Sequence, residues 1–284
     1  MSTLTVTPLP ALQPRSRFGV IAWVCSVFLV VIVVGALLAP MLAPYAPDEI
    51  DFDNIWSSPN AAHWLGTDQL GRDLLSRALF GARDSLLGPV LLLLLATVAG
   101  LAIGTLAAWK GGWVDTLLAR ITDVMFAFPG ILFVVLVIAV LGQGAATTIV
   151  ALALAYTPVI AKYTRSLVLA EMVRPYVDAY RLQGVSPTSI AVRFVVPNIA
   201  PSMVGYLVVL FGDALMSLAT LSYLGFGSQP PSSEWGLMVQ EGQSAVIQGY
   251  FWPVFVPGAL IALVVVAVNV VGVKISDRMN ARMR

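Results

Sequence analysis

The sequence predicts an all-α protein that crosses a membrane about six times. Of its 284 residues, 58% are hydrophobic and only 11% are charged, whereas soluble domains carry roughly 25% charged residues. The apolar residues come in runs of about twenty or more, the length that a helix needs to cross a hydrocarbon core of about 30 Å. Six such runs are present, at residues 18–42, 86–109, 117–141, 147–169, 199–223 and 251–273.

The first run follows Arg15 and Arg17 and could be read as a signal peptide. The run is about 25 residues long, however, and prolines follow its candidate cleavage sites, so we expect a retained span. Residues 1–17 then form a short tail in front of it.

The distribution of Lys and Arg predicts the orientation, because positive charge is retained on the cytoplasmic side. Of the 16 basic residues, only Arg72, Arg77 and Arg83 fall in the connections after spans 1, 3 and 5. Nine acids share those connections: Asp48, Glu49, Asp51, Asp53, Asp68, Asp73, Asp84, Glu234 and Glu241. We therefore expect cytoplasmic termini (tails 1–17 and 274–284), external segments at 43–85 and 224–250, and a cytoplasmic segment at 170–198.

The external segment 43–85 contains the only histidine, His63, followed by an apolar stripe. The stripe consists of Leu70, Leu74, Leu75, Ala78 and Leu79. This helical spacing predicts a helix that lies in the membrane interface. For His63, beside Trp64, packing at the interface is favoured over metal ligation.

The cytoplasmic segment 170–198 contains residues that typically begin and end helices, at a spacing that predicts two short helices. Pro175 can open the first, Gly184 can end it, and Ser186 can cap a second that begins at Pro187. Because connections in compact proteins are usually only a few residues long, we favour a docking surface over a passive loop.

Three features stand out inside the spans. Gly100 and Gly104 form a GxxxG step that permits close helix approach, and packing within one subunit is favoured over a dimer contact. Pro129 and Pro158 are expected to kink spans 3 and 4.

Asp213 is the single clear acid in the middle of span 5. A lone acid there should face protein or water, because exposure to lipid is costly. Two roles stay open, namely lining of a translocation pathway with substrate contact, and structural pairing with a neighbouring helix, which could belong to a partner subunit.

No catalytic constellation is present, so we do not expect an enzyme. The sequence has no phosphate-binding loop, no HExxH, no GxSxG and no CxxC, and one histidine makes a metal site improbable. If the protein uses ATP, another chain must bind it.

Nucleic acid is not an expected partner, because topology explains the basic residues. A channel, an ion-coupled carrier and an ATP-driven permease remain; one internal acid and no evident repeat argue against the carrier.

The cytoplasmic segment also contains a spaced pattern. It has Asp178, Ala179 and Tyr180, then Gly184, and later Phe194 followed by Val196 and Pro197. This resembles the EAA signature of binding-protein-dependent ABC importer permeases, with Asp178, Tyr180 and Val196 as departures from it.

Three further stretches resemble the C-type subunits of the dipeptide, oligopeptide and nickel permeases. They comprise His63 to Arg83, Gly111 to Pro129, and Leu221 to Gly236. Leu218 departs from the pattern, because many relatives carry an acid there. The resemblance covers most of the chain in order.

The resemblance implies a type I importer fold in a bacterial inner membrane, with residues 86–273 as the permease core. It implies a second, B-type permease, two ATPase subunits that bind ATP and Mg, an external substrate-binding protein and peptide substrates. Nickel chelates, glutathione or another small solute are the alternatives. The residues implied in ATPase coupling are Asp178, Ala179, Arg181, Gly184, Arg193 and Pro197.

Overall fold

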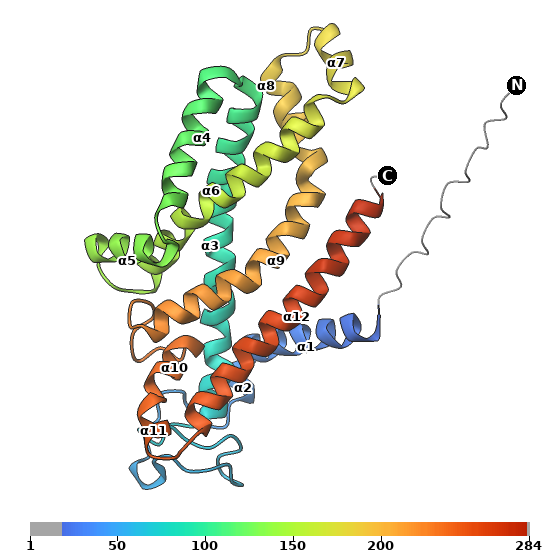
Figure 1. Ribbon diagram of the computed structural model, residues 1–284. Helices are drawn as coiled ribbons and strands as arrows, with labels where there is room; N and C mark the ends of the chain where they lie inside the picture. The colour runs from blue at the N-terminus through green and yellow to red at the C-terminus, as the bar shows by residue number, and fades with distance from the viewer. Residues whose placement is uncertain (1–18, 283–284) are drawn as a thin grey trace, which may run out of the picture.

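The computed structural model describes residues 19–282, and it consists of helices joined by irregular segments, as the sequence predicts (Figure 1). The expected N-terminal tail, residues 1–17, lies outside the described residues. The α-helices are α1 (Val20–Leu37), α2 (Ala39–Leu42), α3 (Leu74–Lys110), α4 (Gly112–Ala127), α5 (Gly130–Leu141), α6 (Ala145–Met172), α7 (Pro175–Leu182), α8 (Pro187–Ile190), α9 (Val196–Tyr223), α10 (Trp235–Glu241), α11 (Gln243–Ile247) and α12 (Trp252–Arg282). Two short elements complete the set, the 3₁₀ turn η1 (Phe52–Asn54) and the π-helical turn η2 (Ala191–Val195).

Five helical segments are long and apolar enough to cross a membrane. They are α1, α3, α6, the continuous stretch Pro187–Tyr223, and α12 over Trp252–Ser276. The pair α4 and α5 would make a sixth crossing, but the two helices meet at an angle of 92°. The described residues therefore contain five candidate spans, or six if α4 and α5 together form one broken span, in agreement with the expected number of about six.

The break in the third span corrects the expected single helix over 117–141. Phe128 has extended backbone angles, with ψ of 134°, and Pro129 then caps α5. Proline lacks the N–H that a helix needs and disfavours helical angles in the residue before it. Pro158, by contrast, lies inside α6 without ending it.

The apolar stripe at residues 70–79 does not form a separate interfacial helix, which is a second correction. From Leu74 onward it is the beginning of α3, whose first turn is capped by the Asp73 carboxylate through the Ser76 N–H, at 2.8 Å. Leu74 and Ala78 are buried against the external segment that contains Trp235. Protein atoms therefore cover Leu74 and Ala78, while Leu70, Leu75 and Leu79 are half-buried.

The long helix α3 is the centre of the fold, and α6 and α9 pack along it (Figure 1). The two glycines of the GxxxG step allow α3 and α6 to approach each other closely. A Cβ on Gly104 would lie 2.4 Å from the Ala161 carbonyl oxygen, and one on Gly100 would lie 2.8 Å from Ile160 Cγ2. The expected packing within one subunit is confirmed.

Several connecting segments lie at two opposite ends of the molecule, whereas the bend between α4 and α5 and the connection from α5 to α6 lie between those ends (Figure 1). Figure 1 shows α7, α8 and the end of α12 at one end, and the segment after α2 with α10 and α11 at the other. These are the same two groups that the Lys and Arg distribution assigned to opposite sides of the membrane. The fold therefore agrees with the proposed sidedness, which itself stays a prediction.

Candidate functional site

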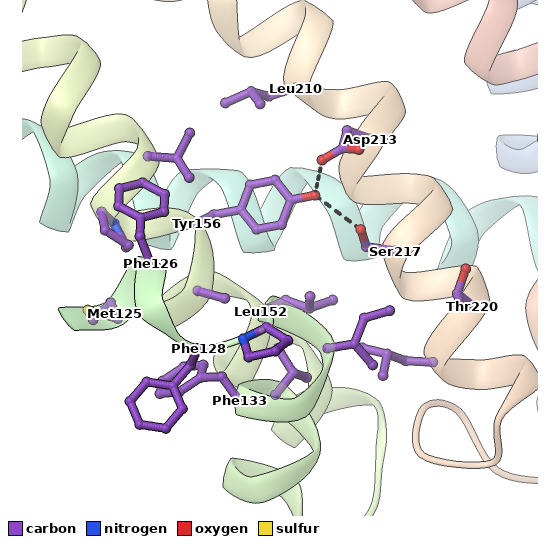
Figure 2. A pocket seen from close by; sticks show the side chains of 18 of the residues that line it. Met125, Phe126, Phe128, Phe133, Leu152, Tyr156, Leu210, Asp213, Ser217 and Thr220 are labelled. Carbon is purple, nitrogen blue, oxygen red and sulfur yellow. Dashed lines mark hydrogen bonds between the residues drawn. The ribbon is translucent and has the colours of Figure 1, made fainter. Parts of the chain in front are cut away.

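A large apolar cavity opens where the broken third span faces α6 and α9. Its volume is about 670 Å³, within the range of about 300 to 1,000 Å³ that is typical of small-molecule sites. Four short segments line it: residues 125–134 around the bend, 152–159 of α6, and 210–213 and 216–221 of α9. Figure 2 shows aromatic side chains from the bend on one side and polar side chains of α9 on the other.

The polar side of the cavity is a row on one face of α9. Asp213, Ser217 and Thr220 follow one another at helical spacing and line the same cavity. From α6, the Tyr156 hydroxyl donates to Asp213 Oδ2 at 2.5 Å and lies 3.1 Å from Ser217 Oγ. The tyrosine has a single hydroxyl proton, so Ser217 is the donor in the second bond. This network ties α6 to α9 at the level of the cavity (Figure 2).

Asp213 lies on the wall of the cavity, which is the position that a role in lining a translocation pathway requires. Its side chain is exposed, and Tyr156 is its partner within the chain. Among the described residues, no basic side chain makes an ion pair with it. An acid at the centre of a span costs about 2.5 to 3.5 kcal/mol on insertion. A pathway-lining role is therefore compatible with the structure, and pairing with a partner subunit stays untested.

The six residues implied in ATPase coupling lie away from the cavity, between the C-terminal end of α6 and the first turn of α9. Each is exposed, as a docking surface requires: Asp178, Ala179, Arg181, Gly184, Arg193 and Pro197. The expected helix, turn and helix are present as α7 and α8, although α8 continues through η2 into α9 as one helix over Pro187–Tyr223.

Gly184 makes the turn between α7 and α8. Its φ is +75°, in the left-handed region, and a Cβ there would meet no atom within 4 Å. The Gly184 and Val185 N–H groups close the end of α7 on the carbonyls of Arg181 and Tyr180, each at 3.1 Å. Ser186 then caps α8 by accepting from the Ser189 N–H. A glycine is needed here for its backbone freedom and not for space.

Aromatic stacking holds α7 against the π-helical turn η2 that follows α8. The rings of Tyr180 and Phe194 stack with centroids 4.1 Å apart. Arg181 bonds Asp178 at 3.1 Å, and its guanidinium lies over the Trp109 ring at the end of α3, 5.8 Å from the centroid. Tyr180, a departure from the EAA pattern, thus has a packing role that alanine could not fill.

Glu171, at the end of α6, is a residue that sequence reasoning missed. Its Oε1 accepts from the Tyr176 hydroxyl of α7 at 3.0 Å and from Asn198 of α9 at 3.4 Å, while Oε2 pairs with Arg174 at 3.1 Å. Burial raises the pKa of the Tyr176 hydroxyl. Glu171 therefore joins α6, α7 and α9 at the base of the exposed helix pair α7–α8. The signal that the sequence offered for Glu171 was an acid at the end of an apolar span.

The external segments are joined by a buried ionic cluster that the sequence did not reveal. Arg77 lies 2.5 Å from Asp68 and 2.8 Å from Glu241, and Arg72 lies 2.7 Å from Asp68 and 2.9 Å from Glu241. All four side chains are less than 10% exposed. This cluster fixes the segment after α2 to α10.

The lone histidine belongs to the same buried region. His63 Nδ1 lies 3.1 Å from Asp73 Oδ1, and the Tyr45 ring packs on the imidazole with centroids 4.9 Å apart. His63 is thus buried inside the protein and does not lie at the membrane interface, where the sequence predicted it. Among the residues in the described part of the chain, no group of three His, Cys, Asp or Glu side chains could hold a metal ion.

Glu234 caps α10 beside this cluster. Its carboxylate accepts from the N–H groups of Gly236 and Leu237 at 2.9 and 3.0 Å. Burial raises the pKa of Glu234, against the opposite effect of these hydrogen bonds. The external segments thus form a rigid cap on the spans.

Comparison with known proteins agrees with the geometry. Residues 100–284 match the family described as binding-protein-dependent transport system inner membrane component. Residues 20–62 match the N-terminal TM domain of oligopeptide transport permease C.

Three curated relatives align over nearly the whole chain. The glutathione transport system permease protein GsiD of Escherichia coli O6:K15:H31 and that of Shigella boydii serotype 4 are each 36% identical over 279 residues, which is 98% of this chain and 92% of the relative. The GsiD protein of Pectobacterium atrosepticum is 35% identical over 265 residues, 93% of this chain and 88% of the relative. With its apolar helices, the chain is therefore a multi-pass bacterial inner-membrane protein that belongs to the ABC importer permeases of the peptide and nickel family.

Proposed function

We propose that this chain is the C-type permease subunit of an ATP-driven importer of small peptides. The observation that carries the proposal is that the cavity and the exposed helix pair α7–α8 lie at two ends of the same helices, α6 and α9. A force applied to α7 and α8 would thus reach the cavity wall through two continuous helices.

Polar contacts at two levels couple α6 to α9 along this route. At the cavity, Tyr156 bonds Asp213 and Ser217; at the base of α7, Glu171 bonds Asn198. When partner ATPases close on ATP, α7 and α8 would move with them, and α6 and α9 would shift relative to the broken span. That shift would open the cavity alternately to each side of the membrane.

The partners follow from the family and from what the chain lacks. Two cytoplasmic ATPases would bind ATP and Mg and receive α7 and α8. Asp178, Arg181 and Arg193 would supply polar contacts, Ala179 would allow close packing, Gly184 would make the turn, and Pro197 would lie on the same exposed surface. A B-type permease would complete the cavity, and an external binding protein would deliver substrate.

Small peptides are the proposed substrates, with glutathione as the first to assay. The family model over residues 20–62 is named for oligopeptide transport, and three relatives are named for glutathione transport. Nickel chelates are the second candidate within the same mechanism. An ion-coupled carrier or a channel would be a different class, and it predicts transport by this chain without nucleotide.

The test is purification of the tagged chain from its native membrane, identification of the co-purifying chains, and reconstitution in vesicles. We expect a second permease and ATPases, and uptake of labelled glutathione or dipeptide that requires ATP and the binding protein. Recovery of the chain alone, with uptake that needs no nucleotide, would replace the importer by a carrier or channel.

A further inference from the structure

The residues that line the cavity carry charge of one sign only. Asp213 is the only charged side chain among the residues that line the cavity; the other polar side chains there are Tyr156, Ser217 and Thr220. The basic side chain closest in sequence to the α6 part of the wall is Lys162, and its ammonium lies over the Phe126 ring, 5.5 Å from the centroid. The wall that this chain supplies therefore offers a negative charge and no positive one.

The Asp213 carboxylate also has unused hydrogen-bonding capacity. A carboxylate can accept about four hydrogen bonds, and in the described structure Asp213 accepts one, from Tyr156 to Oδ2. Tyr156 itself is buried and held by Ser217. The carboxylate is thus oriented by its neighbours and still open toward the cavity.

From this geometry we propose that Asp213 forms a subsite for the ammonium group of the substrate, so that the importer selects solutes with a free primary amine. Tyr156 is a positioning residue that fixes the carboxylate. The proposal rests on the proposed function, and it deepens it by naming the substrate class. A free amino terminus is the chemistry that peptides share with glutathione, whose γ-glutamyl residue keeps its α-amine.

A substrate amine is favoured over a basic side chain of the partner permease because Asp213 lies on a concave wall. A basic side chain of the partner would have to enter this cavity of about 670 Å³ to reach the carboxylate. Aromatic and aliphatic walls around one oriented charge are typical of sites for small amphipathic ligands. Pairing with the partner subunit is the competing outcome, and the test separates the two.

The test uses a cysteine reporter inside the cavity of the assembled transporter in lipid nanodiscs. Cys25, the only cysteine, lies in α1 outside the cavity and is replaced by alanine. Thr220→Cys then places a reporter thiol on the cavity wall. Its modification rate is measured with 2-aminoethyl methanethiosulfonate, a cation, and with 2-sulfonatoethyl methanethiosulfonate, an anion.

We expect the ratio of cation to anion rates to fall about fourfold in Asp213→Asn, because positions 213 and 220 lie about 10 Å apart along α9 and one charge at that distance changes the ratio by about this factor in water. Asp213→Glu should keep the ratio. Asp123→Asn is the matched control, because Asp123 is an exposed acid on α4 that does not line this cavity; it should leave the ratio unchanged. An unchanged ratio in Asp213→Asn would overturn the proposal.

A second measurement needs no change at Asp213 and so does not depend on the folding of that variant. Glutathione or alanyl-alanine should protect the reporter thiol of Thr220→Cys from modification, whereas their N-acetylated forms should not. Equal protection by the acetylated forms would overturn the proposal, and so would absence of protection by the free amines, since Asp213 would then be held by the partner subunit. Loss of ATP-dependent uptake in the parent protein would instead count against the proposed function, so the two failures are distinguishable.

Discussion

At the scale of single residues, backbone conformation decides which positions tolerate change. Gly184 occupies the left-handed region with open space around it. A non-glycine residue there costs about 1 to 2 kcal/mol, with Asn among the few residues that visit the region routinely. The turn that presents α7 and α8 therefore depends on this position.

Gly184→Val should abolish or strongly reduce ATP-driven uptake, because a β-branched residue would distort the turn. Gly184→Asn should keep most of it. Uptake in vesicles and retention of the ATPase subunits on the purified chain measure the effect. Wild-type uptake and ATPase binding in Gly184→Val would refute the coupling role of this loop.

Buried charge gives a second expectation at the residue scale. Arg77→Met would leave Asp68 and Glu241 with fewer positive partners in a site that excludes water. Breaking a buried ion pair costs about 3 to 5 kcal/mol. The midpoint of thermal unfolding of the solubilised protein should fall clearly.

Arg83→Met is the control for that change. Arg83 is exposed, and surface substitutions usually stay within about 0.5 kcal/mol of the parent. If both variants unfolded at the same temperature, the ionic cluster would not stabilise the external segments.

At the scale of elements, close packing of α3 on α6 carries the fold, because both helices are long and meet through small residues. Gly104→Ala would place a methyl group 2.4 Å from the Ala161 carbonyl oxygen. Overpacking of this kind costs about 1 to 3 kcal/mol, so the thermal unfolding midpoint should fall. Gly258→Ala in α12, where a Cβ meets nothing within 4 Å, should be neutral or slightly stabilising, since alanine favours helix more than glycine does. If both variants shifted the unfolding midpoint equally, the close contact of Gly104 with Ala161 would not determine the stability of the protein.

At the scale of the whole molecule, the charge distribution predicts which end faces the cytoplasm. Single cysteines at Phe52 and Ile247, 69% and 84% exposed at one end, and at Leu182, 90% exposed at the other, can report this in a Cys25→Ala background. In intact spheroplasts, an impermeant maleimide should label the first two and spare the third. The reverse pattern would invert the topology and remove the cytoplasmic role of α7 and α8.

The sequence by itself determined the all-α class, the approximate number of spans and the position of the exposed helix pair α7–α8. These features follow from local signals: apolar runs of membrane length, charge asymmetry, and the sequence of Pro175, Gly184 and Ser186. Asp213 was identifiable too, because an acid within an apolar run is conspicuous whatever surrounds it.

Only the tertiary structure decided where the remaining side chains lie. Tyr156 reads as one more apolar residue until α6 is placed against α9, and Arg77 reads as an interfacial cation until Glu241, distant in sequence, is brought to it. The 92° bend at Pro129 likewise exceeds the kink that one proline predicts. Contacts between residues far apart in the chain have no local signature, because the physical reason for them is the packing of whole helices.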